Sequence, residues 1–366
     1  MKKILLITTT PFYLEKGSSL RIFVLSKILS KEYKIDLVTY SLGQDVEISN
    51  VTIYRTPKFF KPKIGVGKPS IGKLGLDMFV FFKCIFLMFK NDYDILHCED
   101  FEAAVLGRIL IIFKKNIKFV YDLHNRLLDN LRSKGIKVSG VIEKVILIIE
   151  KSIIKRSNLI ILNWRKYEDD KVFKNKNTIT YYDQINIGEF KECVLPAKEY
   201  LIYTGNFEKY QGHLEFLEAY SQSQGSYSLV LIGDITEEVS NFIKSNEKLS
   251  RTVIVLGRLS IEESNYLIVN SLAGILPRLD GSSMKVIHYL MLGKPVIAKN
   301  TISNRELLKN EYNGLLYENI NELINVLDLI NSDRDVLNKL KLGVEETAKS
   351  IKGNWDQPSF LKKYEI

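Results

Sequence analysis

With 366 residues, the chain is longer than one hydrophobic core normally supports, and its 46% hydrophobic and 26% charged residues argue against disorder, so two globular domains are expected. The excess positive charge lies in the first half: residues 1–197 carry 33 Lys and Arg against 21 Asp and Glu, whereas residues 198–366 carry 19 against 22. The scattered cysteines, Cys84, Cys98 and Cys193, argue against a disulfide framework or a zinc site.

Strand-like and helix-like segments alternate through the first half. The apolar run 3–9 has strand length and no signal-peptide cleavage site follows it, so we interpret it as the first buried strand of a cytoplasmic protein. Residues 18–31 then show the apolar spacing of a helix. Such alternation predicts a parallel sheet covered by helices on both faces. Further strands are predicted over 35–40, 51–55, 94–99, 118–124, 158–163 and 178–182, and helices over about 103–113 and 140–156.

A basic segment and an apolar segment separate the third and fourth predicted strands. Residues 56–75 contain five lysines and no acid, and residues 78–89 are apolar except for Lys83. The apolar run is shorter than the roughly 20 residues that a transmembrane helix needs. One interpretation is a basic loop and helix on an anionic membrane face, which the charge of the first half favours. The other is a solvated loop before a buried core helix.

The same alternation restarts after an interruption at 183–199. The sequence therefore predicts an α/β protein of two Rossmann-like doubly wound domains, residues 1–190 and residues 191–350. Because ligands bind beyond the carboxyl ends of parallel strands, two such domains facing across a cleft would carry their sites at strand ends. The strands of the second domain are predicted over 200–207, 228–234, 252–258, 272–278 and 295–300.

Small residues follow the first predicted strand of each domain. Gly17 and Ser18 precede a helix, whose free backbone N–H groups could hold an anion, although a simple capped turn is the alternative. Gly205 and Gly212 flank a turn that could admit a phosphate close to the backbone. Their spacing differs from the dinucleotide fingerprint, so a nicotinamide cofactor is not favoured.

The segment 275–300 is the most informative motif. A strand ends at Pro277, a loop with Arg278 follows, and a helix is predicted to start near Ser283. The N-terminus of that helix could hold a diphosphate. Lys285 lies in its first turn, where a cation opposes the helix dipole, and a bound anion would account for its position.

Several motifs in order resemble glycosyltransferase family 4, the retaining enzymes of the GT-B architecture. They are YTGNF…QG at 203–212, the LPR stretch ending at Arg278, K-x-x-H-Y-L-x-x-G-K-P-V from Lys285, and E-L-L-x-x-x-x-N-G-L-L from Glu306. The resemblance covers nearly the whole chain. It implies that residues 191–350 bind the donor nucleotide and that residues 1–190 form the acceptor side. It also implies that a C-terminal helix in 351–366 returns to the N-terminal domain.

This chain departs from the family pattern at four donor-side positions. The two glutamates that the family separates by seven residues are Asp280 and His288 here. The usual Arg after the first glycine is Asn206, and the usual Lys before the second is Gln211. The chain therefore resembles a branch of the family with a degenerate Glu-x7-Glu motif.

The resemblance also implies roles for particular residues. Arg278 and Lys285 would neutralise the diphosphate, His288 would hydrogen-bond the ribose, and Glu306 would make a further donor contact. His124 follows a strand where the family places a cleft histidine near the transferred sugar; a structural histidine is the alternative. The predicted catalytic residues are His124 and Asp280, and the predicted donor-binding residues are Gly17, Ser18, Gly205, Asn206, Gln211, Gly212, Arg278, Ser283, Lys285, His288 and Glu306.

The predicted function is that of a hexosyltransferase-type glycosyltransferase. It would move a sugar from a nucleotide sugar, expected to be a UDP-sugar, to a glycan or lipid-linked acceptor with retention, in surface polysaccharide biosynthesis. No Asp-x-Asp motif calls for a metal, and no other cofactor is expected. Peripheral contact with the anionic inner face of the membrane is expected, whereas nucleic acid is not, because aromatic residues do not interleave with basic ones. The alternatives are a sugar-nucleotide epimerase and a catalytically degenerate GT-B protein that binds membranes.

Overall fold

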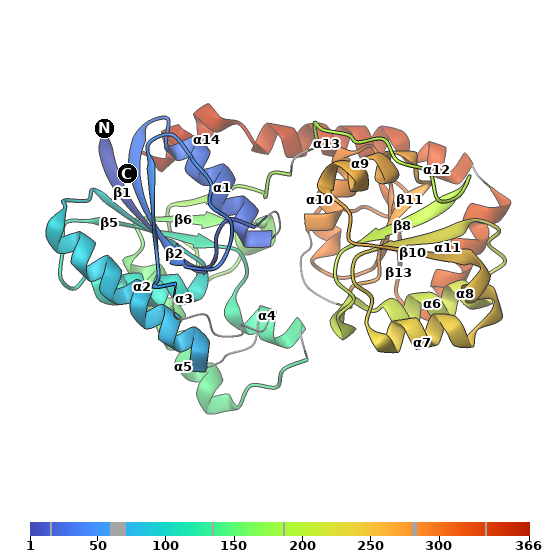
Figure 1. The fold of residues 1–366 in the computed structure, drawn as a ribbon, viewed down its shortest axis with the longest axis horizontal. Helices are drawn as coiled ribbons and strands as arrows, with labels where there is room; N and C mark the ends of the chain where they lie inside the picture. The colour runs from blue at the N-terminus through green and yellow to red at the C-terminus, as the bar shows by residue number, and fades with distance from the viewer. Residues whose placement is uncertain (15–16, 59–70, 134, 186, 280–283, 334) are drawn as a thin grey trace. The chain divides into compact units, whose positions relative to one another are not determined.

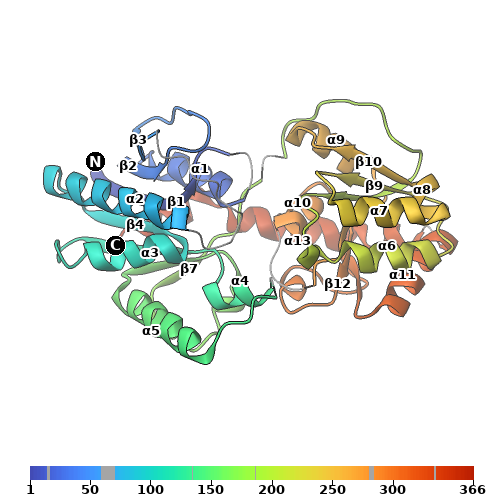
Figure 2. The same cartoon turned by 60° about the horizontal axis from the view of Figure 1, so that its bottom comes forward.

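The computed structural model describes residues 1–366 except 15–16, 59–70, 134, 186, 280–283 and 334. The chain divides into two compact units. Each unit contains a parallel sheet with helices on both faces (Figures 1 and 2), which confirms the predicted α/β class. The first unit comprises Met1–Leu131, Lys137–Gln184 and Asn354–Ile366, and the second comprises Arg132–Ile136 and Ile185–Gly353.

In the described residues, the first unit's sheet has seven parallel strands in the order β3-β2-β1-β4-β5-β6-β7. The strand order reverses between β1 and β4, and such a switch point opens a crevice at the carboxyl ends of the strands. Strand residues are apolar on both faces because helices cover both: Ile4 and Leu5 are fully buried. The strands are β1 (Lys2–Pro11), β2 (Tyr33–Tyr40), β3 (Val51–Arg55), β4 (Ile95–Glu99), β5 (Lys118–Leu123), β6 (Leu159–Leu162) and β7 (Thr178–Thr180).

The helices of this unit form two layers. On one face, α1 (Gly17–Leu29) and α14 (Gln357–Tyr364) pack over a core that includes Leu25 and Phe360. On the other face, α2 (Ile71–Lys90), α3 (Asp100–Leu110) and α5 (Gly140–Arg156) lie side by side (Figures 1 and 2). The short α4 (Leu127–Ser133) and the 3₁₀ turn η1 (Arg165–Tyr167) complete the unit.

The second unit's sheet has six parallel strands among the described residues, in the order β10-β9-β8-β11-β12-β13. Its last strand, β13, was not predicted. The strands are β8 (Tyr200–Thr204), β9 (Ser228–Ile232), β10 (Val253–Gly257), β11 (Ala273–Leu276), β12 (Val296–Lys299) and β13 (Gly314–Tyr317). The helices are α6 (His213–Gln222), α7 (Glu237–Ser245), α8 (Glu247–Thr252), α9 (Ile261–Asn270), α10 (Met284–Met291), α11 (Ile320–Ser332), α12 (Asp335–Lys339) and α13 (Lys341–Asn354), with 3₁₀ turns η2 (Lys209–Gln211) and η3 (Asn304–Glu306).

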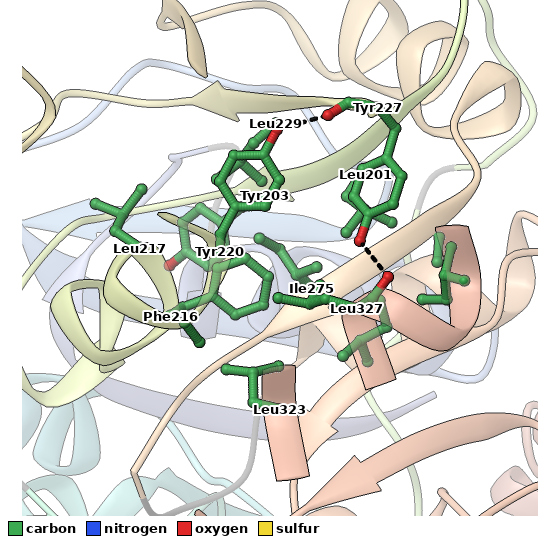
Figure 3. Packing of buried hydrophobic residues seen from close by; sticks show 14 of the residues in the cluster. Leu201, Tyr203, Phe216, Leu217, Tyr220, Tyr227, Leu229, Ile275, Leu323 and Leu327 are labelled. Carbon is green, nitrogen blue, oxygen red and sulfur yellow. Dashed lines mark hydrogen bonds between the residues drawn. The ribbon is translucent and has the colours of Figure 1, made fainter. Parts of the chain in front are cut away.

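Buried tyrosines help to fix α6 and α11 on this second sheet (Figure 3). The Tyr220 hydroxyl donates to the carbonyl oxygen of Tyr227 at 2.5 Å, and the Tyr227 hydroxyl donates to that of Leu327 at 3.0 Å. Their rings pack among aliphatic side chains such as Leu201 and Leu323. Because each buried phenol has a hydrogen-bond partner, these rings add apolar contact without an unsatisfied polar group.

The apolar segment 78–89 belongs to α2 and is only partly a core helix. Cys84 and Leu87 are buried, whereas Phe82 and Phe86 are exposed. Residues 59–70 of the basic segment lie outside the described residues. Among the helices that are described, none has the length and apolar character needed to cross a bilayer.

Candidate functional site

Polar side chains of the first unit meet at the switch point between β1 and β4. Thr8 of β1 pairs in register with Glu99 of β4, and Glu99 pairs with Asp122 of β5. His124 follows β5 directly, and its Nε2 lies 3.4 Å from Oε1 of Glu99 and 3.9 Å from Oδ2 of Asp122. The Thr8 hydroxyl donates to the other oxygen of Glu99. The structure thus places His124 beside two carboxyl groups at the carboxyl ends of the strands.

Two atoms of this group are buried without a hydrogen bond. They are Oε1 of Glu99 and Nε2 of His124, and neither makes one within the described part of the chain. Glu99 is 1% exposed and His124 is 8% exposed. Buried polar atoms in native proteins nearly always have partners, so this pair is suited to meet a bound polar group. Asp100 next to Glu99 has φ +64°, a strained conformation of the kind that gathers at functional sites.

Burial and neighbouring charges separate the pKa values of these groups. Burial raises the pKa of Glu99 to about 8, against the lowering effects of His124 and Thr8. Burial also tends to raise the pKa of Asp122, but the Arg21 guanidinium, His97 and His124 together outweigh this effect and hold that pKa below its usual range. For His124, burial would lower the pKa, but Glu99 and Asp122 raise it above its ordinary value. At neutral pH the site therefore combines a largely protonated Glu99 with an ionised Asp122.

Arg21 of α1 connects this site to the strands around it. Its guanidinium donates to Asp122 at 2.8 Å, to Asp183 at 3.1 Å and to the carbonyl oxygen of Tyr181 at 2.8 Å. A third side chain, Asn163, accepts at 3.2 Å. Arg21 is nearly inaccessible, and a buried cation needs such a complete set of acceptors. The network fixes the start of α1 against β5 and β6.

Gly17 and Ser18 lie in the first turn of α1, not before the helix as predicted from the small-residue pattern. Gly17 has φ +55°, and an added Cβ would meet no atom within 4 Å, so the space around it is open. Ser19 accepts a hydrogen bond from the backbone N–H of Leu14 at 2.7 Å. The residues immediately before this turn, 15–16, lie outside the described residues.

His97 has a different position from His124. Its Nδ1 shares a hydrogen bond of 2.8 Å with the hydroxyl of Tyr364, and the two rings stack. It thereby connects β4 with α14. Sequence reasoning did not select Glu99 or Arg21. Glu99 does end a predicted strand, but single acids are common there, and an arginine inside a helical pattern reads as solvent-exposed.

In the second unit, two predicted donor-binding loops pack tightly together. Gly212 has φ +72°, and a Cβ there would lie 2.3 Å from the carbonyl oxygen of Pro277. Gly205 has φ +134°, and its own carbonyl oxygen would lie 2.0 Å from a Cβ on Gly233. The backbone N–H of Leu279 donates to the carbonyl oxygen of Tyr210 at 3.2 Å. Glycine is therefore required for the loop after β8 to contact the loop after β11.

Two cations lie at these loops. The ammonium of Lys285 on α10 donates to the Tyr203 hydroxyl at 2.9 Å, and a Cβ on Gly205 would come within 2.4 Å of the lysine Cε. The Arg278 guanidinium lies over the ring of Tyr210, 5.0 Å from its centre. Burial, together with Arg278, lowers the pKa of Lys285 to about 7. A bound anion would have the opposite effect on this pKa.

Asn206 and Gln211, which occupy the positions of a family Arg and Lys, contact each other. The Gln211 amide donates to Oδ1 of Asn206 at 3.2 Å. The Gln211 Oε1 atom is buried and has no hydrogen bond within the described ranges. His213 follows at the start of α6, and burial lowers its pKa to about 3, so it is neutral. The turn thus presents neutral amides in place of the two cations.

His288 and Glu306 lie apart from this pair of amides. Nε2 of His288 shares a hydrogen bond of 2.6 Å with Oδ1 of Asn265 on α9, and burial lowers the pKa of His288 to about 4. Glu306 ends η3 and is partly exposed. Asp280 and Ser283 lie outside the described residues. Within the described ranges, no group of His, Cys, Asp and Glu side chains is arranged to hold a metal ion.

Most of the second unit resembles a known protein family. Residues 189–346 match the family described as "Glycosyl transferases group 1". This range contains the paired loops and both cations described above. A glycosyltransferase of Methanocaldococcus jannaschii, itself called uncharacterised, is 25% identical over 322 residues, which are 83% of this chain and 82% of the relative.

Solved structures match the fold over nearly the full length of this chain. Sucrose-phosphate synthase from Thermosynechococcus elongatus matches with a TM-score of 0.80 and 16% identity, covering 100% of this chain and 99% of that one. Anabaena HepE in complex with UDP-glucose matches with a TM-score of 0.70 and 16% identity, covering 99% and 100%. At this identity the likeness shows the fold alone, which is GT-B.

Proposed function

We infer that this chain, a glycosyltransferase in which residues 189–346 match the group 1 family, transfers a sugar from a nucleotide-sugar donor to a glycan acceptor. The observation that carries the inference is the position of the partly buried Lys285 ammonium, which lies against the Gly205 turn and close to Arg278. Holding a partly buried cation near another cation costs free energy, as the lowered pKa of Lys285 reflects. A diphosphate at this turn would offset that cost.

The donor in this proposal is a UDP-sugar. Support comes from the Anabaena protein HepE, which has the same fold and was solved with UDP, with UDP-glucose, and with UDP and glucose. The diphosphate would lie at the Gly205 turn, beside the Lys285 side chain that packs against that glycine. The nearby neutral amides of Asn206 and Gln211 could donate hydrogen bonds to phosphate oxygens.

The proposed chemistry is breakage of the bond between the sugar carbon and the diphosphate oxygen. Negative charge grows on the leaving diphosphate, and Arg278 and a protonated Lys285 would stabilise it. We propose that Glu99 and His124 of the first unit bind sugar hydroxyl groups of the acceptor. A hydroxyl both donates and accepts, so it complements a carboxyl oxygen and an imidazole nitrogen that make no hydrogen bond within the described residues. Retention of configuration is proposed from the resemblance to the retaining enzymes of family 4.

The proposed acceptor is a lipid-linked glycan of surface polysaccharide biosynthesis, reached by peripheral contact with the inner face of the membrane. The excess of lysine and arginine in residues 1–197 supports contact with anionic lipid. The first unit would then hold the acceptor at the carboxyl ends of its strands.

The direct test is a thermal-shift screen of the purified chain against UDP-, GDP-, ADP- and CMP-sugars. We expect a UDP-sugar to raise the melting temperature, because a ligand that binds only the folded state stabilises it. A folded sample that responds to no activated sugar would overturn the proposal. NMR of the bound donor without acceptor then separates transfer from epimerisation, since an epimerase would convert the donor by itself.

A further inference from the structure

Helix α2 exposes a line of large apolar side chains. Their spacing of four, four, four and three residues places them on one side of the helix. Phe89 is 74% exposed, and Phe82 and Phe86 are each more than half exposed. The opposite side, with Val80 and Cys84, is buried against the rest of the unit. The exposed residues of α2 are Leu74, Met78, Phe82, Phe86 and Phe89.

The neighbouring helices extend this line into a face. Helices α2, α3 and α5 lie side by side in both views (Figures 1 and 2). Between α2 and α3 runs a shallow groove lined by apolar side chains, including Met88, Leu110 and Phe113. Soluble monomers rarely expose such extended apolar surface without a partner. The further exposed residues are Ile109, Ile112 and Phe113 at the end of α3, and Val141, Ile142, Val145 and Ile148 on α5; with those of α2 we call them the apolar face.

Lysines border the apolar face. The Lys83 ammonium lies 5.5 Å from the ring centre of Phe86, and that of Lys90 lies 5.9 Å from it. Beyond the apolar residues of α5, a pocket of about 420 Å³ is lined by Lys151, Lys155, Lys171 and Lys176, together with Ile154 and Val172. Long lysine side chains can reach along apolar surface to a charged layer. We call this the lysine pocket.

This combination favours one kind of partner over others. Cores of protein–protein interfaces are enriched in aromatic residues, methionine and arginine and depleted of lysine. The phenylalanines of the apolar face would suit a protein or a membrane, but the cations beside them are lysines, which protein interfaces disfavour. An apolar face bordered by lysine is typical of helices that lie in the interface of an anionic membrane.

We propose that the apolar face of α2, α3 and α5 inserts into the surface of an anionic bilayer, while the lysine pocket binds a lipid phosphate. The proposal rests on the proposed function in one respect, since a lipid-linked acceptor would be found at the same surface. It extends the sequence-based expectation of a basic loop and an apolar helix on the membrane. The contact is made by the exposed sides of three helices, of which only α2 was part of that expectation.

The test is co-sedimentation of the full chain with vesicles of phosphatidylcholine alone or mixed with phosphatidylglycerol. We expect the wild type to bind the anionic vesicles, and Phe82→Ser/Phe86→Ser to weaken partitioning at least about tenfold, because two apolar rings are lost. Lys151→Gln/Lys155→Gln should weaken binding by about fivefold per lysine on anionic vesicles only. The matched control, Leu329→Ser/Leu342→Ser, changes exposed apolar residues of the second unit and should bind like the wild type.

Two further measurements make the outcomes distinct. Circular dichroism melts check folding, which the exposed positions of Phe82 and Phe86 should leave intact. If the phenylalanine variant binds vesicles as well as the wild type does, the proposal is wrong. It is also wrong if the wild type ignores vesicles and forms a dimer that the variant dissociates. Thermal shift on the same variants measures donor binding, which should stay unchanged. If no sample, including the wild type, binds a donor, the proposed function is wrong, but the result on membrane binding is unaffected.

Discussion

Glu99 shows how one buried residue can link stability to pH. Its pKa rises from an ordinary value near 4.5 to about 8 on folding, because burial disfavours the charged form. Between these pH values the folded state keeps a proton that the unfolded state releases. Stability should therefore fall as pH rises through this window, by at most about 1.4 kcal/mol per pH unit.

Glu99→Gln should remove this dependence while keeping the polar contact with Thr8. We expect the variant to differ little from the wild type at pH 4.5 and to gain relative stability steadily up to pH 8. Urea unfolding at four pH values measures the difference in unfolding free energy. Glu345→Gln, an exposed position, is the control and should show no such trend. Parallel stability curves for Glu99→Gln and the wild type would contradict the assignment.

Lys285 provides the corresponding prediction for donor binding. Because its pKa in the free chain is about 7, an increasing fraction of this group is neutral above that pH. Diphosphate binding needs the charged form, so donor affinity should fall above pH 7, by up to about tenfold per pH unit, with proton uptake on binding. Isothermal titration calorimetry in buffers of different ionisation enthalpy measures both quantities.

Lys285→Met should weaken donor binding by about 1.5–3 kcal/mol, since a charge-assisted contact is lost, and should flatten the pH dependence. Lys349→Met changes an exposed lysine of the same unit and is the control. A variant with wild-type affinity at pH 6.5 would show that Lys285 does not contact the donor.

The residues of the site differ in how well they could be predicted from the sequence. Gly205, Gly212 and Lys285 stand at a strand end or a helix start, so local pattern was enough to select them. Glu99 and Arg21 derive their importance from neighbours about 90 to 160 residues away, such as Thr8 and Asp183. A pattern confined to nearby residues contains no signal for such contacts.

At the scale of elements, the contact between the loops after β8 and β11 depends on glycine for two reasons, backbone conformation and the absence of a side chain. Gly212 needs both a left-handed backbone and the absence of a side chain, whereas Gly293 after α10 has a similar φ of +75° but open space around it. Backbone strain alone costs a non-glycine residue roughly 1–2 kcal/mol. The close approach to Pro277 adds a second cost only at Gly212.

Gly212→Ala should therefore destabilise the chain clearly more than Gly293→Ala does, and should also reduce donor binding by displacing the turn. Urea denaturation compares the two variants, and thermal shift with a UDP-sugar follows the binding. Equal losses of stability at both positions would mean that the two loops are not held together through Gly212.

Elements with a strong apolar pattern were predicted well. Strand β13 and the division of α2 into a buried and an exposed side were not. The strands of both sheets follow the apolar runs, because strands buried on both faces must be apolar along their length. Strand β13 was missed, although β12, which is equally short, was predicted. For α2, the sequence did not decide between a membrane-facing helix and a buried helix. The structure shows one buried side, with Leu87, and one exposed apolar side, with Phe86. Composition alone does not reveal which apolar residues lie on which side.

At the scale of the whole molecule, the first unit is built from three separated stretches of chain. Residues 354–366 belong to it although the second unit intervenes in the sequence. Helix α14 contributes Phe360 and Tyr364 to the core beneath α1, and Tyr364 reaches His97 of β4. Part of the helical layer that packs on the first sheet therefore comes from the C-terminal end of the chain.

Phe360→Ala should consequently destabilise the first unit through a residue near the C-terminus. Removing a fully buried ring costs about 3–5 kcal/mol, because apolar contact is lost and a cavity remains. Hydrogen exchange followed by mass spectrometry should show faster exchange in β1 and β4, while β8 and β11 keep their protection. Tyr364→Phe removes only a hydroxyl and should cost about 1 kcal/mol. Faster exchange confined to the second unit would instead mean that α14 supports that unit and not the first sheet.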